Sequence, residues 1–138
     1  MKIRLALPIA LLAVCVAATG AAGADAHTKR FPTTVEVIDE DVLEDGVTGI
    51  VAARVRAGRV ACRANRVVVG IGFYTDGSRR VIDRTRTTAL GALALTFDLT
   101  GFDRGVLSVP RKRFGPRKKK HRHVCRPATS GGEMMAAR

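Results

Sequence analysis

The chain has 138 residues, of which 46% are hydrophobic and 4% aromatic, and its formal net charge is +12 at pH 7. This length suits one domain rather than two. The charge favours anionic partners over cationic ones, and the absence of tryptophan argues against an antibody-type immunoglobulin domain, which packs a tryptophan against its disulfide.

The first 26 residues have the layout of a secretory signal peptide. Lys2 and Arg4 form a basic start, residues 5–18 are apolar, and small residues lead to an A-x-A cleavage pattern at 24–26. A membrane anchor is the alternative, but the apolar run is shorter than the ~20 residues of a spanning helix. We expect a secreted or cell-envelope protein whose mature chain, residues 27–138, does not span a membrane.

The cysteines fit this location. Cys15 would leave with the signal peptide, so Cys62 and Cys125 remain as a pair in an oxidising compartment. A disulfide between them is therefore expected. A metal-binding or redox thiol is the alternative, but no C-x-x-C spacing supports it.

The mature chain shows a period of two, which is typical of half-buried antiparallel strands. Seven runs follow this pattern, with Gly and Asp-Gly turns between them: residues 33–38, 46–55, 66–74, 79–88, 92–99, 105–110 and 123–128. The run at 79–88 is mostly polar and is predicted to be an edge strand. Seven short strands at this spacing predict an all-β antiparallel sandwich over residues 27–127. Residues 128–138 are small and polar, and we expect a disordered tail there.

The alternation also predicts which side chains point into the sandwich. The predicted inward set is Val35, Val37, Val47, Val51, Ala53, Val55, Val67, Val69, Ile71, Phe73, Leu93, Leu95, Phe97, Leu99, Leu107 and Val109. In residues 66–74 this choice leaves Gly70, Gly72 and Tyr74 facing outward.

Several segments resemble a known family: FPTTVEV, GIVAARVRAGRVACRANRVVVGIGFYTDGS, TTALGALALTF, and a cysteine in the last strand. They are similar to small secreted β-sandwich domains of high-GC Gram-positive bacteria, related to the prealbumin-like or carboxypeptidase-regulatory-like family. Cys62, residues 66–69 and Cys125 match the family's pattern of one Cys before an R-x-V-x-V strand and another after a Lys/Arg-rich stretch. Residues 87–91 depart from it, because TTALG stands where the family has an aspartate. The resemblance implies the fold and an extracellular location, but no activity.

Residues 111–126, RKRFGPRKKKHRHVCR, hold nine of the 24 Lys and Arg residues. We predict a loop whose cations bind polyanions by releasing counterions: Arg111, Lys112, Arg113, Arg117, Lys118, Lys119, Lys120 and Arg122. The partner would be an anionic cell-wall or extracellular polymer such as teichoic acid, lipopolysaccharide, extracellular DNA or a sulfated polysaccharide. Specific nucleic-acid recognition is not expected, because Phe114 is the one aromatic nearby and no nucleic-acid-binding motif is present. A solvated loop that resists aggregation is the alternative.

Residues 35–46, VEVIDEDVLEDG, are as acidic as the later stretch is basic. Carboxylates suit calcium, but the spacing does not match a calcium-binding D-x-[DN]-x-[DN]-G loop. The stretch could instead pair with the basic loop, within one chain or head-to-tail between chains. The interpretation we favour is an exposed charged turn.

The histidines suggest a further alternative. His27 would be the first mature residue, and His121 and His123 have metal-ligand spacing, so a copper-binding carrier is an alternative function. Enzyme motifs are absent, with no G-x-S-x-G, H-E-x-x-H or glycine-rich phosphate loop. We expect a non-catalytic module without a cofactor, with a small secreted hydrolase as the remaining alternative.

Overall fold

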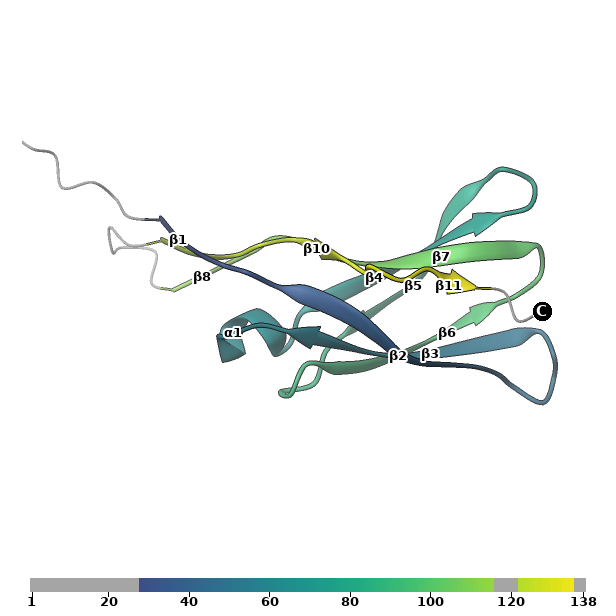
Figure 1. Cartoon of the computed structure of the whole chain (residues 1–138), viewed down its shortest axis with the longest axis horizontal. Helices are drawn as coiled ribbons and strands as arrows, with labels where there is room; N and C mark the ends of the chain where they lie inside the picture. The colour runs from purple at the N-terminus through teal and green to yellow at the C-terminus, as the bar shows by residue number, and fades with distance from the viewer. Residues whose placement is uncertain (1–27, 116–121, 136–138) are drawn as a thin grey trace, which may run out of the picture.

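The computed structural model describes residues 28–115 and 122–135, which form an all-β fold with one short helix (Figure 1). The elements are β1 (Thr28–Phe31), β2 (Thr34–Val42), β3 (Thr48–Arg56), α1 (Val60–Arg63), β4 (Val67–Tyr74), β5 (Arg79–Arg86), β6 (Ala92–Asp98), β7 (Phe102–Val109), β8 (Lys112–Phe114), β9 (Arg122–Cys125), β10 (Ala128–Thr129) and β11 (Met134–Met135). The predicted signal peptide and the tip of the predicted basic loop lie outside the described residues.

Two sheets form the sandwich. The first has the order β2-β3-β6, and the second has the order β10-β7-β4-β5 with β11 also paired to β7. Apolar side chains from both sheets meet in one core, which includes Val51, Val55 and Leu95 from the first sheet and Val68 and Leu107 from the second. The predicted antiparallel sandwich and its edge strand at β5 are therefore confirmed.

The predicted inward face of β4 is wrong. Val68, Gly70 and Gly72 are buried, whereas Val67, Val69, Ile71 and Phe73 are only partly buried. The glycines face inward because Ile82 and Phe102 occupy the space a side chain would need: a Cβ would lie 2.8 Å from Ile82 Cγ1 at Gly70, and 2.7 Å from Ile82 Cγ2 and 3.1 Å from Phe102 Cε2 at Gly72. Outside, Arg79 and Arg104 lie over the Phe73 ring, at 5.9 and 5.1 Å from its centroid.

Val47 is also placed wrongly by the alternation. It is 53% exposed, because it belongs to the hairpin turn that precedes β3 and so lies outside the alternating strand.

A third, small sheet extends one end of the sandwich, and it was not predicted. Its order is β1-β9-β8. β1 runs parallel to β9, with Arg30 opposite Val124 and Phe31 opposite Cys125, while β8 pairs with β9 antiparallel. Each of its strands continues into the sandwich: β1 leads into β2, β7 into β8, and β9 into β10.

The predicted disulfide is confirmed and belongs to this small sheet. Cys62 in α1 is bonded to Cys125 at the end of β9, with 5.3 Å between the two Cα atoms. Both cysteines are fully buried and form a minor core with Phe31, against which Ala57 and Phe114 pack. The bond therefore fastens α1 to the small sheet.

The expected disordered tail is wrong for residues 128–135. β10 and β11 pair with β7, and Ser130 Oγ accepts the Leu107 N–H at 3.1 Å. Met134 is fully buried, and it fits because Gly105 has no side chain there; a Cβ on Gly105 would lie 2.6 Å from Met134 Cε. The free edge of β7 supplies hydrogen bonds to a polar segment, and one apolar side chain anchors it.

In the part of the chain that the structure describes, no helix has the length and apolar character needed to cross a membrane.

Reducing the Cys62–Cys125 disulfide should lower the free energy of unfolding by about 4 kcal/mol, because the bond closes a long loop in the unfolded chain. Its partners are 63 residues apart. Urea unfolding of the same protein with and without a reductant measures this difference and leaves the sequence unaltered. An unchanged midpoint would mean that the bond does not contribute to the stability of the fold.

Met134→Ala should destabilise the protein by about 2–5 kcal/mol, as truncation of a fully buried side chain does. The matched control is Glu133→Ala, which removes an exposed ion pair with Arg104 and should cost no more than about 1 kcal/mol. Urea unfolding compares the two variants, and equal effects would contradict the docking of β11 on β7.

Candidate polyanion-binding surface

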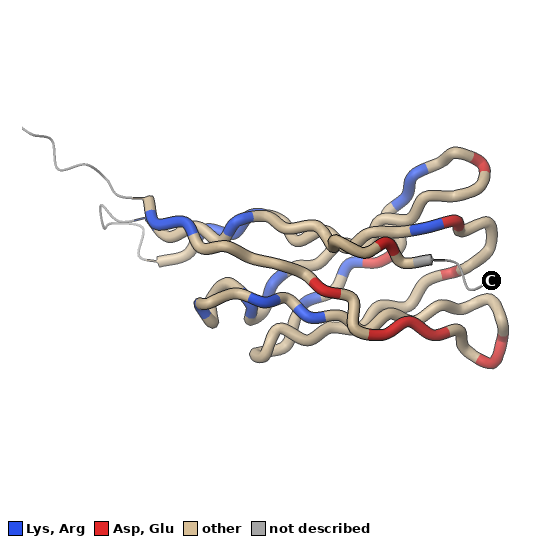
Figure 2. The backbone as a smooth tube through the Cα atoms, in the orientation of Figure 1, with Lys and Arg blue, Asp and Glu red and all other residues tan. Residues whose placement is uncertain are grey.

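Charge is separated along the molecule (Figure 2). Lys and Arg gather at the end formed by the small sheet and α1, Asp and Glu line the far half of β2 and the hairpin to β3, and both signs of charge occur on the β4–β5 hairpin and on β7. The sequence explains the basic end, since residues 26–35 and 104–132 contain no Asp or Glu. The small sheet brings these two segments together.

One face of the small sheet carries arginines from all three strands. Arg30 on β1 and Arg113 on β8 are both paired with Val124 on β9, so the three form a row across the sheet. Side chains alternate along a strand, so positions two residues from a member of the row lie on the same face. We call this set the arginine face: Arg30, Arg111, Arg113, Arg122 and Arg126, all of which are exposed.

The strand geometry continues far enough to place Arg126 on this face. Its backbone N–H donates to the Phe31 carbonyl oxygen at 2.9 Å, which extends the pairing of β1 with β9. Arg30, Arg111 and Arg126 line a shallow hollow of about 300 Å³ together with Val124 and Pro127. Val124 is only 3% exposed, as expected where aliphatic arginine stems cover an apolar side chain.

Among residues 28–115 and 122–135, no ion pair involves the arginine face. The ion pairs there are Arg56–Glu36, Arg80–Asp76 and Arg104–Glu133. Like charges on neighbouring strands repel one another. An anion lying across the face would relieve that repulsion, and guanidinium groups offer paired donors that match phosphate, sulfate and carboxylate groups.

Lys112, another of the predicted cations, does not lie on the arginine face. It is paired with Cys125 and therefore lies on the opposite side of the sheet, where its Nζ donates to the Ala64 carbonyl oxygen at 3.4 Å. Burial lowers the pKa of Lys112, and the nearby cations Arg66 and Arg86 lower it further. Arg30 and Arg126 belong to the surface but were missed, because only the parallel pairing of β1 with β9 reveals them.

Arg66 is buried at the basic end and hydrogen-bonds two of its segments. Its side chain is 1% exposed; Nη1 donates to the Cys62 carbonyl oxygen at 2.9 Å, and Nη2 donates to the Pro110 carbonyl oxygen at 2.5 Å. Burial lowers the pKa of its guanidinium group. These bonds tie α1 to the segment that enters β8. Sequence reasoning treated Arg66 only as part of a strand pattern and gave no signal of this role.

The remaining predicted cations, Arg117, Lys118, Lys119 and Lys120, lie outside the described residues. So do His27 and His121, two of the three predicted copper ligands. His123 is described, and its ring lies edge-on to Phe31 with the centroids 5.7 Å apart and 5.1 Å from the Phe114 centroid. Across residues 28–115 and 122–135, no group of three or more His, Cys, Asp or Glu side chains could hold a metal ion.

The acidic stretch forms a self-contained hairpin end. Asp45 Oδ1 accepts the backbone N–H groups of Val47 (2.9 Å) and Thr48 (2.8 Å), and Oδ2 accepts the Thr48 hydroxyl at 2.6 Å. The Thr48 hydroxyl, followed by these two amides, lowers the pKa of Asp45. The hairpin lies at the opposite end from the arginine face (Figure 2), so it does not reach the described part of the predicted basic stretch in the same chain. Glu36, near the start of the acidic stretch, pairs instead with Arg56 on β3, with Nε and Oε2 2.7 Å apart.

We compared the chain with protein-family models, with curated proteins and with solved structures, and none of these comparisons found a match. The β-sandwich that the prealbumin-like resemblance implies is present. The relationship to that family itself stays an expectation.

Thr48→Val should raise the pKa of Asp45 towards its ordinary value, because the largest cause of its lowering is the Thr48 hydroxyl. A lowered pKa stabilises the fold above the carboxyl's ordinary pKa, and this stabilisation is lost as the pH falls through the pKa of the folded state. The stability difference between the wild type and Thr48→Val should therefore shrink in acid.

Carboxyl NMR titration measures the shift directly. The internal control is Asp76, whose pKa is lowered by Ser78 on another hairpin and should not change. If the pKa of Asp45 stays where it was in Thr48→Val, the hydroxyl does not hold this turn.

Proposed function

We propose that the protein is a secreted, non-catalytic module of the cell envelope or extracellular space that binds an anionic polymer through the arginine face. One observation carries this proposal: the small sheet gathers five exposed arginines on one face, without a carboxylate among the chain segments that build it. Teichoic acid, lipopolysaccharide, extracellular DNA and sulfated polysaccharides all present the anionic groups that such a face would bind.

Arginines on a sheet should bind a polyanion at a lower entropic cost than arginines on a solvated loop. The strands fix the backbone of each arginine, so less conformational freedom is lost on binding. Each contact releases counterions from the polymer, which makes the affinity fall steeply with salt. The predicted loop cations Arg117, Lys118, Lys119 and Lys120 lie between β8 and β9 in the sequence, and we include them as an extension of the same surface.

Location and ancestry belong to the same proposal. Secretion is supported by the signal-peptide pattern in residues 1–26 and by a disulfide, because such bonds persist in oxidising compartments. Membership of the prealbumin-like or carboxypeptidase-regulatory-like family is supported by the sandwich and by the positions of Cys62 and Cys125. No catalytic motif in the sequence favours an enzyme, and no described contact favours the copper carrier.

Replacing Arg30, Arg113 and Arg126 with Ser should reduce the slope of log affinity against log salt for heparin by about one unit for each lost contact. The matched control replaces Arg79, Arg80 and Arg84 on β5 with Ser, which removes the same charge from another part of the surface. Both triple variants and the wild type are applied as mature protein to immobilised heparin, and the slope is measured over a series of salt concentrations.

Equal slopes for the two triple variants would mean diffuse attraction to a very basic protein, and the proposal would fall. A third variant, with Arg117, Lys118, Lys119 and Lys120 changed to Ala, measures the contribution of the predicted loop. If the slope of log affinity against log salt falls only in this third variant, the contact surface is the loop and the arginine face is not involved.

A further inference from the structure

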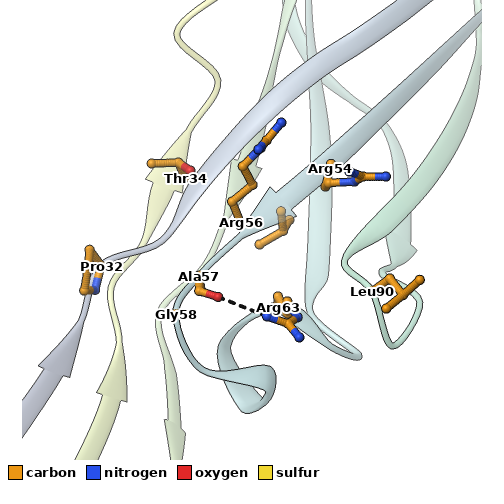
Figure 3. Close-up of a pocket in the computed structure, with 9 residues that line it drawn as sticks. Pro32, Thr34, Arg54, Arg56, Ala57, Gly58, Arg63 and Leu90 are labelled. Carbon is orange, nitrogen blue, oxygen red and sulfur yellow. Dashed lines mark hydrogen bonds between the residues drawn. The ribbon is translucent and has the colours of Figure 1, made fainter.

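A second group of arginines borders a larger hollow next to the small sheet (Figure 3). The hollow has a volume of about 580 Å³, and its lining includes Pro32, Arg54, Arg56, Arg63 and Leu90. Three cations from two separate elements, β3 and α1, therefore surround one depression. None of these residues was predicted to be part of a site.

Strand alternation in β3 and the end of α1 place these arginines around the hollow. Arg54 and Arg56 share the exposed face of β3, because Val55 between them is fully buried in the core. Arg63 ends α1, and its Nη1 donates to the Ala57 carbonyl oxygen at 3.4 Å. The turn before β6 packs tightly here, since a Cβ on Gly91 would overlap the Val55 carbonyl oxygen. That turn presents Leu90, which is 73% exposed.

The charge in the hollow is only partly compensated. Arg56 Nε pairs with Glu36 Oε2 at 2.7 Å, but both side chains are more than half exposed, at 61% and 53%. Such a pair contributes little stability and exchanges readily for another anion. Arg54 is also paired in register with Glu36 across β2 and β3. Three arginines thus border the hollow, and Glu36, which belongs to the acidic stretch, pairs with one of them.

The hollow adjoins the arginine face along the segment that joins β1 to β2. Arg30, Pro32 and Thr34 are exposed, whereas Phe31, Thr33 and Val35 are buried, so the exposed residues follow one side of an extended chain. Arg30 lines the smaller hollow, and Pro32 and Thr34 line the larger one. At about 3.3 Å per residue, Arg30 and Thr34 lie on the order of 13 Å apart.

We infer that the polyanion site is bipartite and takes a linear anionic polymer. The polymer crosses the arginine face, passes Pro32, and makes its last contacts with Arg54, Arg56 and Arg63. Glu36 and the acidic hairpin repel further anionic units, so the contact ends there. The inference rests on the proposed function and deepens it, because a chain too short to span both groups of arginines binds at either one alone.

The arginine face and the arginines of the hollow strengthen each other's binding of one polymer by raising its effective concentration. When one part of a polymer is held on the arginine face, the second binding event becomes intramolecular, which raises the overall affinity by about a hundredfold or more. A short anion has no such gain and occupies the two groups independently. Stoichiometry and chain-length dependence therefore distinguish a bipartite site from a single basic patch.

The test uses the mature protein and calorimetric titration with tripolyphosphate and with long-chain polyphosphate. Tripolyphosphate should bind weakly at two sites per protein, and long polyphosphate should bind once and about a hundredfold more tightly. A parallel series with short and long heparin oligosaccharides shows whether phosphate or sulfate groups are preferred. In both series the chain-length effect is the expected result, and its absence from both would overturn the bipartite site.

The variant that tests the hollow is Arg54→Ser with Arg63→Ser, which leaves the Arg56–Glu36 pair in place. It should lose one tripolyphosphate site and most of the gain shown by the long chain. The matched control is Arg79→Ser with Arg84→Ser on β5, which removes the same charge. Glu36→Gln provides a second test that does not depend on α1 staying folded. It removes the carboxylate that pairs with Arg56 at the hollow and should tighten long-chain binding.

The outcomes distinguish failure of the bipartite site from failure of the proposed function. If the Arg54 and Arg63 variant and Glu36→Gln bind the long chain like the wild type, while loss of Arg30, Arg113 and Arg126 weakens binding, the bipartite site is wrong and the arginine face stands. If neither set of variants differs from the β5 control, both the bipartite site and the proposed function are wrong.

Discussion

Cys62 in α1 and Cys125 in β9 are held together although 63 residues separate them in the chain, and the basic end of the molecule is built around that bond. The small sheet has three strands of three or four residues each, and sheets this small are marginal without further packing. Its own buried core is little more than Phe31 and the two cysteines. The disulfide, together with the Arg66 hydrogen bonds to the carbonyl oxygens of Cys62 and Pro110, therefore carries much of what fixes β8 and β9 and, through them, the arginine face.

The disulfide allows many like charges to lie close together despite their mutual repulsion. Five arginines on one small face repel one another, and the adjoining hollow adds three more cations. A sheet held only by its ladder hydrogen bonds could relieve that repulsion by opening. The covalent bond and the continuation of each strand into the sandwich oppose opening, so the charges stay close in the absence of a ligand. The sandwich supplies the rigid body, and the small sheet carries the arginines.

The sequence predicted the elements whose signal is local. The alternation of Val51, Ala53 and Val55 has one apolar face, so β3 could be assigned without ambiguity. In β4 both faces are apolar or glycine, and the period of two fits either choice; the decision is made by Ile82 and Phe102, which are distant in sequence. Likewise, Ser130 and Met134 look like part of a polar tail until the free edge of β7 is known.

The candidate site was predicted only in part for the same reason. Arg111, Arg113 and Arg122 stand out as part of a dense basic run, and the structure places all three on one face. Arg30 looks like an isolated cation near the mature N-terminus, and Arg54, Arg56 and Arg63 look like solvated residues of a strand and a turn. Their roles depend on the parallel pairing of β1 with β9 and on the turn before β6, which no local pattern indicates.

The measurement that tests this account most directly is an NMR titration of the arginine Nε–Hε resonances in the mature protein with a heparin oligosaccharide. The account predicts that Arg30, Arg113, Arg122 and Arg126 shift together and saturate at one ligand concentration, while Arg79 and Arg84 on β5 stay unchanged. Shifts of similar size spread over all exposed arginines would contradict it, because they would show that the ligand follows the overall charge of the protein and ignores the surface that the small sheet builds.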